Sequence, residues 1–367
     1  MESTLQDILI SHSITYPEME VSDYIKLIYQ NVFGSGHMIS NMSDSESYLK
    51  TEYQTVLAEA NEHKSSLFID AIGNGLCRIY LNPDKIAPDF LPLLNRFFAA
   101  TANTHKGSIS EFREKTSVLY ELATQNRLPL IAESVKSYLQ EYFLEGCPPV
   151  HHSKTFQKKY HPHYRVIRTD YTYYFPAFQS IQRQCESGRP IIIAVDGRCA
   201  SGKSMFAKLL SEVFTCNVFH MDDFFLPFPL RTPERLSKAG GNIDYERFLK
   251  EVLKPLTKGR DICFQPFDCS TRILKPPVFM PASSLSIVEG SYSLHPFLIK
   301  FYDFRIFLTC TPDMHKQRLL NREGKEMLQQ FVERWIPLEE HYFNSCEVAD
   351  HCDMELDTSD FFEINEK

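Results

Sequence analysis

The stretch Gly197-Arg198-Cys199-Ala200-Ser201-Gly202-Lys203-Ser204 fits the pattern G-x-x-x-x-G-K-[ST] and decides the fold of the C-terminal half. It follows an apolar run, Ile191 to Val195, that is typical of a buried parallel strand. It precedes Met205 to Val213, where apolar residues recur at helical spacing. Strand, glycine-containing loop and helix in this order predict a phosphate-binding Walker A loop, or P-loop. In such a loop, backbone N–H groups surround phosphate oxygens and the helix N-terminus adds positive potential.

Each part of this loop has a predicted task. We expect Lys203 to reach the β- and γ-phosphates of ATP and the Ser204 hydroxyl to hold Mg²⁺. The residues predicted to surround ATP are Gly197, Arg198, Cys199, Ala200, Ser201, Gly202, Lys203 and Ser204. Cys199 also raises the hypothesis that its thiol, beside a lysine and a helix N-terminus, has a lowered pKa and makes ATP binding sensitive to oxidation. A small tolerated side chain is the simpler interpretation.

The rest of this half alternates strand-length apolar runs with amphipathic helices. After a short helix at 178–185 and the strand before the P-loop, further strands are expected at 217–220, 286–288, 304–308 and 353–356. This alternation predicts an α/β fold: a parallel sheet of the P-loop NTPase type with helices on both faces.

Carboxylates follow two of these expected strands, at the sheet edge where ligands of open α/β folds bind. Asp222 and Asp223 follow the strand at 217–220, and Glu289 ends the strand at 286–288. We expect Asp222 to take a proton from a substrate hydroxyl and Glu289 to hold Mg²⁺ or its waters. Asp223 is equally well interpreted as a cap of the next segment.

Arginines on the helix after Thr311-Pro312 are candidates for contact with a transferring phosphoryl group. Arg318, Arg322 and Arg334 recur there at spacings that can bring them over one ligand. The alternative is that they pair with glutamates on the surface of the same helix.

The order of these motifs resembles the uridine kinase and phosphoribulokinase family over roughly residues 185–360. The resemblance rests on Asp196 to Ser204, Met221 to Phe225, Gly241 to Asp244, Glu289-Gly290 and Arg318 to Glu323. It implies an ATP- and Mg²⁺-dependent kinase that phosphorylates a hydroxyl of a small molecule, with Asp222 as the catalytic acid–base residue. It further implies that Asp244 holds ribose hydroxyls and that Arg318 and Arg322 belong to a lid.

One segment departs from the family's pattern. Uridine kinases carry an aromatic residue and an aspartate followed by a histidine that helps to read the pyrimidine, whereas this chain has Phe267-Asp268-Cys269-Ser270-Thr271-Arg272. Phe267 and Arg272 are therefore expected at the acceptor, and the acceptor is expected to be a nucleoside-like ribose compound rather than uridine in particular. Pantothenate, glycerate and a sugar phosphate stay open as alternative acceptors.

The N-terminal half is predicted to be mainly helical. Helical spacing covers 24–33, 48–60, 90–100, 112–123 and 130–143. Two apolar runs around Gly73-Asn74-Gly75 predict a hairpin. Residues 144–175, with Pro148-Pro149 and several histidines, suggest an extended linker. The expected domains are 1–170, of unknown role, and 171–367, the kinase.

A candidate site in this half is the glycine-flanked turn that presents His37, although a helix C-cap explains those glycines as well. Other polar residues could converge with His37 on an anion or a metal: Glu52, Arg78, His151, His152, His161, His163 and Arg165. Scattered histidines are more often structural, so a metal site is the less favoured interpretation.

The amino-acid composition of the chain limits the kinds of partner that it is expected to bind. A formal net charge of -8 argues against general nucleic-acid binding, and no apolar stretch suggests a membrane segment or export signal. Ten cysteines without close pairs are typical of reduced thiols, so a cytoplasmic protein is expected. A homo-oligomer stays open. So do two rivals to a simple kinase: a nucleotide-dependent switch that drives the N-terminal domain, and a bifunctional enzyme with a second active site near His37.

Overall fold

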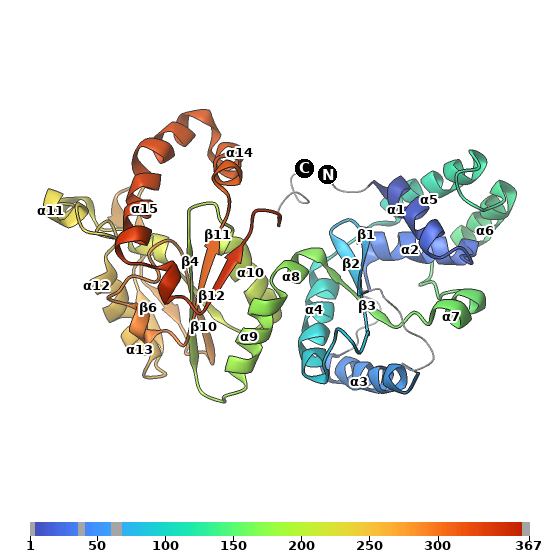
Figure 1. The fold of residues 1–367 in the computed structure, drawn as a ribbon, viewed down its shortest axis with the longest axis horizontal. Coiled ribbons are helices and arrows are strands. Elements are labelled where there is room, and N and C mark those ends of the chain that lie inside the picture. Colours follow the sequence, from blue (N-terminus) through green and yellow to red (C-terminus); the bar gives the residue numbers. More distant parts are fainter. Residues whose placement is uncertain (1–3, 36–40, 60–67, 362–367) are drawn as a thin grey trace. The chain divides into compact units, whose positions relative to one another are not determined.

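The computed structural model of the protein describes residues 4–35, 41–59 and 68–361. The chain divides into two compact units, one that runs from the N-terminus to Tyr173 and one that begins with Tyr174 (Figure 1). Each unit has its own hydrophobic core. Within the described residues, no helix has both the length and the apolar character needed to cross a membrane.

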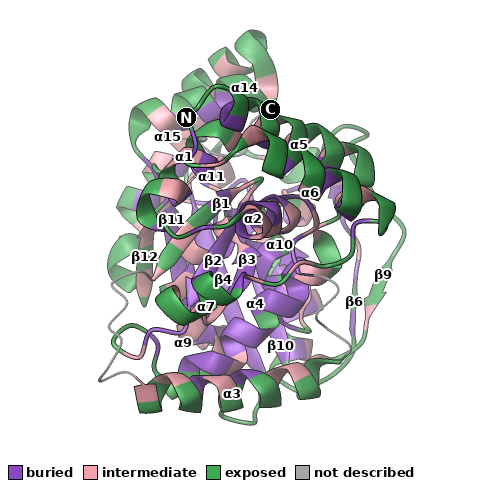
Figure 2. Cartoon of the chain, turned by 90° about the vertical axis from the view of Figure 1, so that its right-hand side faces the viewer, coloured by how far each residue is buried: buried purple, intermediate pink, exposed green. Residues whose placement is uncertain are grey.

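The first unit is mainly helical. Its helices are α1 (Leu5–Thr15), α2 (Val21–Phe33), α3 (Met42–Glu59), α4 (Leu91–Thr104), α5 (Ile109–Thr124), α6 (Ala132–Leu144), α7 (Lys154–Tyr160) and α8 (Thr169–Tyr173), with a short 3-10 helix at Pro88–Phe90. All five predicted helices of this half are confirmed, and α1 was not predicted. The core gathers apolar side chains from α1, α2, α5 and α6, and the outer faces of α3 and α5 are exposed (Figure 2).

A three-stranded antiparallel sheet interrupts these helices. β1 (Ile69–Gly73) and β2 (Leu76–Tyr80) form the predicted hairpin around Asn74, which adopts a positive φ of 56°. β3 (Tyr164–Arg168) pairs with β2 on its other side. The hairpin is confirmed, because its two runs and their glycine-containing turn are local signals that need no distant partner.

The prediction of an extended linker at 144–175 is wrong. This segment contains α7, whose N-cap Ser153 accepts a hydrogen bond from the Phe156 N–H, and β3, which completes the first unit's sheet. Its prolines and histidines suggested a linker, whereas β3 is built from Tyr164-Arg165-Val166-Ile167-Arg168, where two arginines flank two apolar residues. Arg165 is buried in the fold because Glu52 neutralises it at 2.7 Å.

The second unit is built on a five-stranded parallel sheet, as predicted. Its strands are β4 (Ile191–Gly197), β5 (Asn217–His220), β10 (Leu285–Glu289), β11 (Phe304–Thr309) and β12 (Met354–Asp357), in the spatial order β12-β11-β4-β10-β5. All four neighbouring pairs run parallel. β4 is central and entirely buried, which explains its continuous apolar sequence (Figure 2).

Helices flank this sheet and connect its strands. The longer ones are α9 (Phe175–Cys185), α10 (Lys203–Val213), α14 (Pro312–Gln330) and α15 (Ile336–Ser345). Short helices lie between β5 and β6: a 3-10 turn at Met221–Phe224, α11 (Pro233–Leu236), α12 (Tyr245–Phe248) and α13 (Lys254–Leu256). Two small hairpins pair β6 (Ile262–Phe264) with β9 (Val278–Met280) and β7 (Phe267–Asp268) with β8 (Ile273–Leu274). The unit is thus an open parallel α/β sheet, and the P-loop lies at the carboxyl end of its central strand.

Candidate active site

The P-loop joins the end of β4 to the start of α10, and its glycines are required by its shape. Gly197 has a φ of 146°, and a Cβ placed there would lie 2.1 Å from the carbonyl oxygen of Leu308 on the neighbouring strand. Gly202, which precedes α10, has a φ of 96°. No other residue adopts these conformations without strain, so the spacing of the glycines in the motif follows directly from the loop's path.

Lys203 is the first residue of α10, and its side chain folds back over the loop. Its Nζ donates hydrogen bonds to the carbonyl oxygens of Gly197 at 2.9 Å and Arg198 at 2.7 Å. The first N–H groups of α10 have no partner within the helix, as at any helix start. The hydroxyl of Ser201 is buried and has no hydrogen-bond partner among the described residues. A cation, helix N–H groups and a spare hydroxyl together fit a bound phosphate chain.

Ser204 and Glu289 meet at the predicted Mg²⁺ position. The Ser204 hydroxyl lies 3.2 Å from both carboxylate oxygens of Glu289, which ends β10 next to β4. His220, at the end of β5, places its Nδ1 2.5 Å from Glu289 Oε1, and this hydrogen bond raises the pKa of His220. A hydroxyl and a carboxylate are oxygen ligands of the kind that Mg²⁺ prefers, so these residues fit the metal.

Asp222 lies one turn beyond β5, on the 3-10 helix at Met221–Phe224. Its side chain reaches solvent, but the surrounding protein reduces its hydration and raises the pKa of its carboxyl group. The ammonium of Lys203 opposes this shift, so it lies close enough to act on Asp222 electrostatically. The pKa of Asp223 is likewise raised by burial. A carboxylate with a raised pKa near the phosphate-binding lysine is suited to accept a proton.

A buried carboxylate, Asp196, supports the loop from below. It accepts hydrogen bonds from the N–H groups of Gly197, Tyr292 and Leu294 and from the Tyr342 hydroxyl, at distances from 2.7 to 3.1 Å. Complete burial raises its pKa to about 6, while the donors of Leu294, Tyr342 and Gly197 and the charge of Lys203 act in the opposite direction. Asp196 therefore ties the P-loop to the segment after β10 and to α15.

Two neighbouring glutamates of α15 bind the P-loop, and the sequence interpretation missed both. Glu339 is buried, and its carboxylate accepts hydrogen bonds from the Cys199 N–H at 3.0 Å and the Ser291 hydroxyl at 2.7 Å. Glu340 pairs with the Arg198 guanidinium at 2.6 and 3.1 Å. Two adjacent acidic residues on a helix are common on surfaces, so the pair carried no distinctive signal.

The hypothesis of a low-pKa thiol at Cys199 is wrong. Burial raises the pKa of this thiol, and the nearby Glu339 carboxylate raises it further, which outweighs the effect of Lys203. The sulfur instead lies 3.2 Å from Nε2 of His315, whose own pKa is lowered by burial. The sequence showed the cation beside the thiol but not the carboxylate that α15 brings from 140 residues away.

Arg318 is directed toward the back of the P-loop. The guanidinium is buried and donates to the Thr358 side chain at 2.9 Å and to the Thr358 carbonyl oxygen at 2.5 Å. The same Thr358 hydroxyl lies 2.9 Å from the carbonyl oxygen of Ser201. Contact between Arg318 and a transferring phosphoryl group therefore stays a prediction.

The other two candidate arginines are exposed, Arg322 on α14 and Arg334 in the segment that follows it. Nε of Arg322 binds Glu323 at 2.7 Å, and Arg334 stacks over the Trp335 ring at 5.0 Å. Gly324 interrupts α14 with a φ of 79°, so the segment that follows changes direction there. For Arg322, the ion pair with a neighbouring glutamate is the alternative that the sequence left open.

The residues predicted to hold the acceptor gather near Asp222. Asp244 is the N-cap of α12, accepts a hydrogen bond from the Arg247 N–H at 3.1 Å, and donates its own N–H to Phe224. β7, which begins with the buried Phe267, packs against the 3-10 helix that carries Asp222. Arg272 lies in the turn of the same hairpin. Ribose binding by Asp244 stays a prediction.

The polar residues singled out in the first unit form two separate groups. Glu52 binds both His163 at 2.9 Å and Arg165 at 2.7 Å. His37 lies outside the described residues. A second group surrounds the fully buried Arg78, and its other members are Gln30, Asp70, His152 and Tyr164.

Neither group is arranged around a metal. No cluster of three or more metal-ligating side chains occurs within 4–35, 41–59 and 68–361. His161 faces Glu59 at 3.6 Å, and His151 is exposed.

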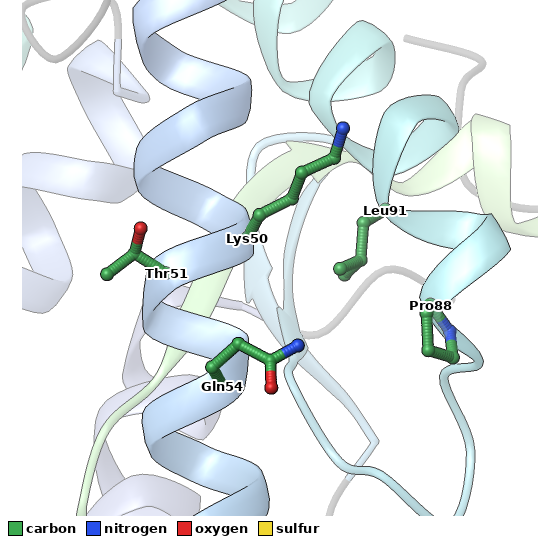
Figure 3. A pocket seen from close by; sticks show the side chains of 5 residues that line it. All are labelled: Lys50, Thr51, Gln54, Pro88 and Leu91. Carbon is green, nitrogen blue, oxygen red and sulfur yellow. The ribbon is translucent and has the colours of Figure 1, made fainter.

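A pocket of about 300 Å³ in the first unit lies between α3 and the start of α4. Its lining residues are Lys50, Thr51, Gln54, Pro88 and Leu91 (Figure 3). Its one charged side chain, Lys50, is paired with Glu46 at 2.6 Å. This pocket is unrelated to the P-loop site, because all of its lining residues belong to the other unit.

The sequence matches no protein-family model and no curated protein. Several solved structures are similar. A possible uridine kinase from Bacillus stearothermophilus is 20% identical over 50% of this chain and 100% of its own, with a TM-score of 0.38. A candidate fructose transport system kinase from a Silicibacter species is 20% identical over 46% and 89%, with a TM-score of 0.32. The YGR205w protein is 18% identical over 52% and 94%, with a TM-score of 0.35. Each of these similarities covers about half of this chain at no more than 20% identity.

Proposed function

We propose that the second unit transfers the γ-phosphoryl group of ATP to a hydroxyl group of a small metabolite. The observation that carries this proposal is the meeting of three groups at one edge of the sheet. The P-loop with Lys203 offers a site for phosphates, the Ser204 and Glu289 pair offers oxygen ligands, and Asp222 offers a nearby proton acceptor. A nucleotide switch has no need for the third group.

In the proposed reaction, the acceptor hydroxyl oxygen forms a bond to the γ-phosphorus while the bond from that phosphorus to the β,γ-bridging oxygen breaks. ADP leaves, and Asp222 takes the hydroxyl proton. Lys203 and the N–H groups at the start of α10 hold the phosphates in place. Bound Mg²⁺ would neutralise phosphate charge, with Ser204 and Glu289 as its protein ligands. Catalysis of this kind consists mainly of positioning and charge stabilisation.

For the acceptor, we propose a nucleoside-like ribose compound as the first candidate, with pantothenate, glycerate and sugar phosphates as alternatives. The support is the position of Asp244, whose backbone pairs with Phe224 only two residues from Asp222. We place the reaction in the cytoplasm.

The test is release of ADP by the full-length protein with Mg²⁺ and ATP, measured across these acceptors. Lys203→Ala serves as the blank, because it removes the cation from the P-loop. Release that depends on an acceptor and disappears in Lys203→Ala supports the kinase. Hydrolysis that proceeds equally without any acceptor, and that Asp222→Asn leaves intact, would instead favour the nucleotide switch.

A further inference from the structure

Two arginines on the acceptor side of the site stack against a single aromatic ring. The guanidinium carbon of Arg231 lies 4.0 Å from the ring centroid of Phe228, and that of Arg272 lies 4.7 Å from the same centroid. Phe228 is 41% exposed, so ring and cations are accessible to solvent. Two positive charges held beside one ring repel each other unless an anion lies near both.

Neither arginine has a carboxylate partner in the described parts of the chain. Nε of Arg231 donates to the Leu226 carbonyl oxygen at 2.6 Å, which uses one of its five N–H groups. Three other cations of this region are paired. Arg235 binds Glu246 at 2.7 Å, Arg247 lies 3.4 Å from Asp244, and Lys275 lies 3.7 Å from Asp268. Arg231 and Arg272 thus differ from these three cations because neither has a carboxylate beside it among the described residues.

The backbone of the β7–β8 turn holds Arg272 in an unusual conformation. Its φ is 62°, in the left-handed region that few residues other than glycine and asparagine adopt. The carboxylate of Asp268 fixes this turn by accepting hydrogen bonds from the Ser270 N–H at 2.8 Å and the Ser270 hydroxyl at 2.6 Å. The Arg272 N–H closes the turn on the Asp268 carbonyl oxygen at 2.7 Å. Backbone strain of this kind concentrates at functional sites.

The arginine pair adjoins the proposed catalytic carboxylate. The hairpin that carries Arg272 packs against the 3-10 helix that carries Asp222. The Cys269 thiol lies within electrostatic range of both Arg231 and Asp222, because Arg231 lowers and Asp222 raises the pKa of this thiol, on top of the dominant increase caused by burial. The cations therefore lie a short distance from where the reacting hydroxyl would meet Asp222.

From these observations we infer that the phosphate acceptor carries an anionic group, a carboxylate or a phosphate, which Arg231 and Arg272 bind together while its hydroxyl faces Asp222. Guanidinium groups bind both anions through paired N–H donors, so the two sources share one chemistry. The inference rests on the proposed kinase function and narrows its acceptor.

The test compares acceptors in matched pairs, with the full-length protein, ATP and Mg²⁺. Nicotinate riboside against nicotinamide riboside and glycerate against glycerol vary a carboxylate, and ribose 5-phosphate against ribose varies a phosphate. We expect kcat/KM for the member that carries the carboxylate or the phosphate to exceed that for the member that lacks it by about tenfold or more, in one carboxylate pair or in the phosphate pair. The pair that shows this difference in kcat/KM identifies whether the bound anion is a carboxylate or a phosphate.

Substitutions of the two arginines test whether they cause this preference. Arg272→Asn keeps a residue that tolerates the positive φ, and Arg231→Gln keeps much of the side chain's length. Each should lower kcat/KM for the anionic acceptor by about tenfold to a hundredfold, mainly by raising its KM, and leave the KM for ATP unchanged. Lys275→Gln is the matched control, because Lys275 is a cation next to the same hairpin that already has a carboxylate partner. It should change neither kcat/KM for the anionic acceptor nor the KM for ATP.

Equal kcat/KM for the two members of every pair, or variants that lower kcat/KM for both members equally, would overturn the inference of an anionic acceptor. The proposed kinase function would be unaffected. A complete lack of acceptor-dependent ADP release across all pairs would remove the kinase function, and this inference with it.

Discussion

The carboxyl group of Asp222 has to be ionised to accept a proton, although its surroundings favour the protonated form. Asp222→Asn removes the proton acceptor and leaves the P-loop in place. We expect kcat for acceptor phosphorylation to fall by about a hundredfold to ten-thousandfold while ATP still binds. Single-turnover kinetics together with a nucleotide-binding titration would measure both effects. Loss of ATP binding in this variant would contradict the assigned role.

The same substitution should raise the stability of the protein at neutral pH. The folded-state pKa of Asp222 is raised, so its contribution to stability is present below the ordinary carboxyl pKa of 3.8 and is lost as pH rises through the folded-state pKa. Asparagine does not ionise. The variant should therefore resist urea better than wild type at pH 7, and the difference should vanish toward pH 4. If the variant and wild type were equally stable at pH 7 as well as at pH 4, Asp222 would be well hydrated in the folded protein.

Glu289 offers a second test at the residue scale, because its carboxylate lies 3.2 Å from the Ser204 hydroxyl. Glu289→Gln keeps the shape and removes the negative charge beside the proposed metal. We expect the Mg²⁺ concentration needed for half-maximal ADP release to rise about tenfold or more. Ser286→Ala, on the same strand, is the control and should leave the Mg²⁺ requirement unchanged.

Among single residues, the positions of those that belong to local motifs were predictable. Lys203 and Ser204 follow from the P-loop pattern, and Asp222 and Glu289 from their positions after parallel strands. Glu339 was not predictable, because its contact with the Cys199 N–H joins residues 140 positions apart and depends on how α15 packs. The raised pKa of Cys199 depends on that same packing, which explains why the thiol hypothesis failed.

At the scale of elements, α15 stabilises the P-loop through the carboxylate of Glu339. Glu339→Ala would leave the Cys199 N–H and the Ser291 hydroxyl without this acceptor in a buried place. The Ser291 hydroxyl keeps the Gly197 carbonyl oxygen as an acceptor at 3.0 Å. We therefore expect the free energy of unfolding of the second unit to fall by about 1–3 kcal/mol, the cost of one unsatisfied group. Urea denaturation followed by Trp335 fluorescence would measure it.

Glu340→Ala is the matched control for that experiment. Glu340 occupies the next position on α15, but its ion pair with Arg198 is partly exposed, so its removal should cost less than about 1 kcal/mol. Equal losses in both variants would mean that the buried carboxylate does not brace the loop.

Elements with regular periodicity were predicted well, and the exceptions share a cause. The strands of the parallel sheet are continuous apolar runs, and the hairpin of β1 and β2 is marked by its turn. β3 contains two buried or half-buried arginines, Arg165 and Arg168, whose charges hide its strand character until their partners Glu52 and Asp170 are known. The partner of Arg165 lies 113 positions away in the chain, so the burial of this charge has no local signal in the sequence.

For the whole molecule, two cores predict two separable unfolding transitions. Arg78 is fully buried in the first unit, where it binds Gln30 at 2.8 Å and faces Asp70 at 3.6 Å. Arg78→Met would leave these partners uncompensated and should lower the stability of the first unit by about 3–5 kcal/mol. Circular dichroism reports both units, whereas the protein's single tryptophan, Trp335, reports only the second.

We therefore expect the part of the circular dichroism transition that belongs to the first unit to shift and the fluorescence midpoint to stay constant. Arg113→Met removes an exposed cation that stacks on Phe143 at 4.5 Å and should change either midpoint by less than about 1 kcal/mol. A fluorescence midpoint that moves together with the circular dichroism would show that the units unfold as one.

The link from Thr358 to the P-loop has a consequence for how the protein is made. The carbonyl oxygen of Ser201 is met by a hydroxyl that lies 157 positions later in the chain. On the ribosome, the phosphate-binding loop is therefore synthesised long before Thr358. The nascent chain passes through a stage in which the motif is complete but lacks the hydrogen bond from Thr358. Nucleotide affinity should then arise late in translation, after β12 has joined the sheet.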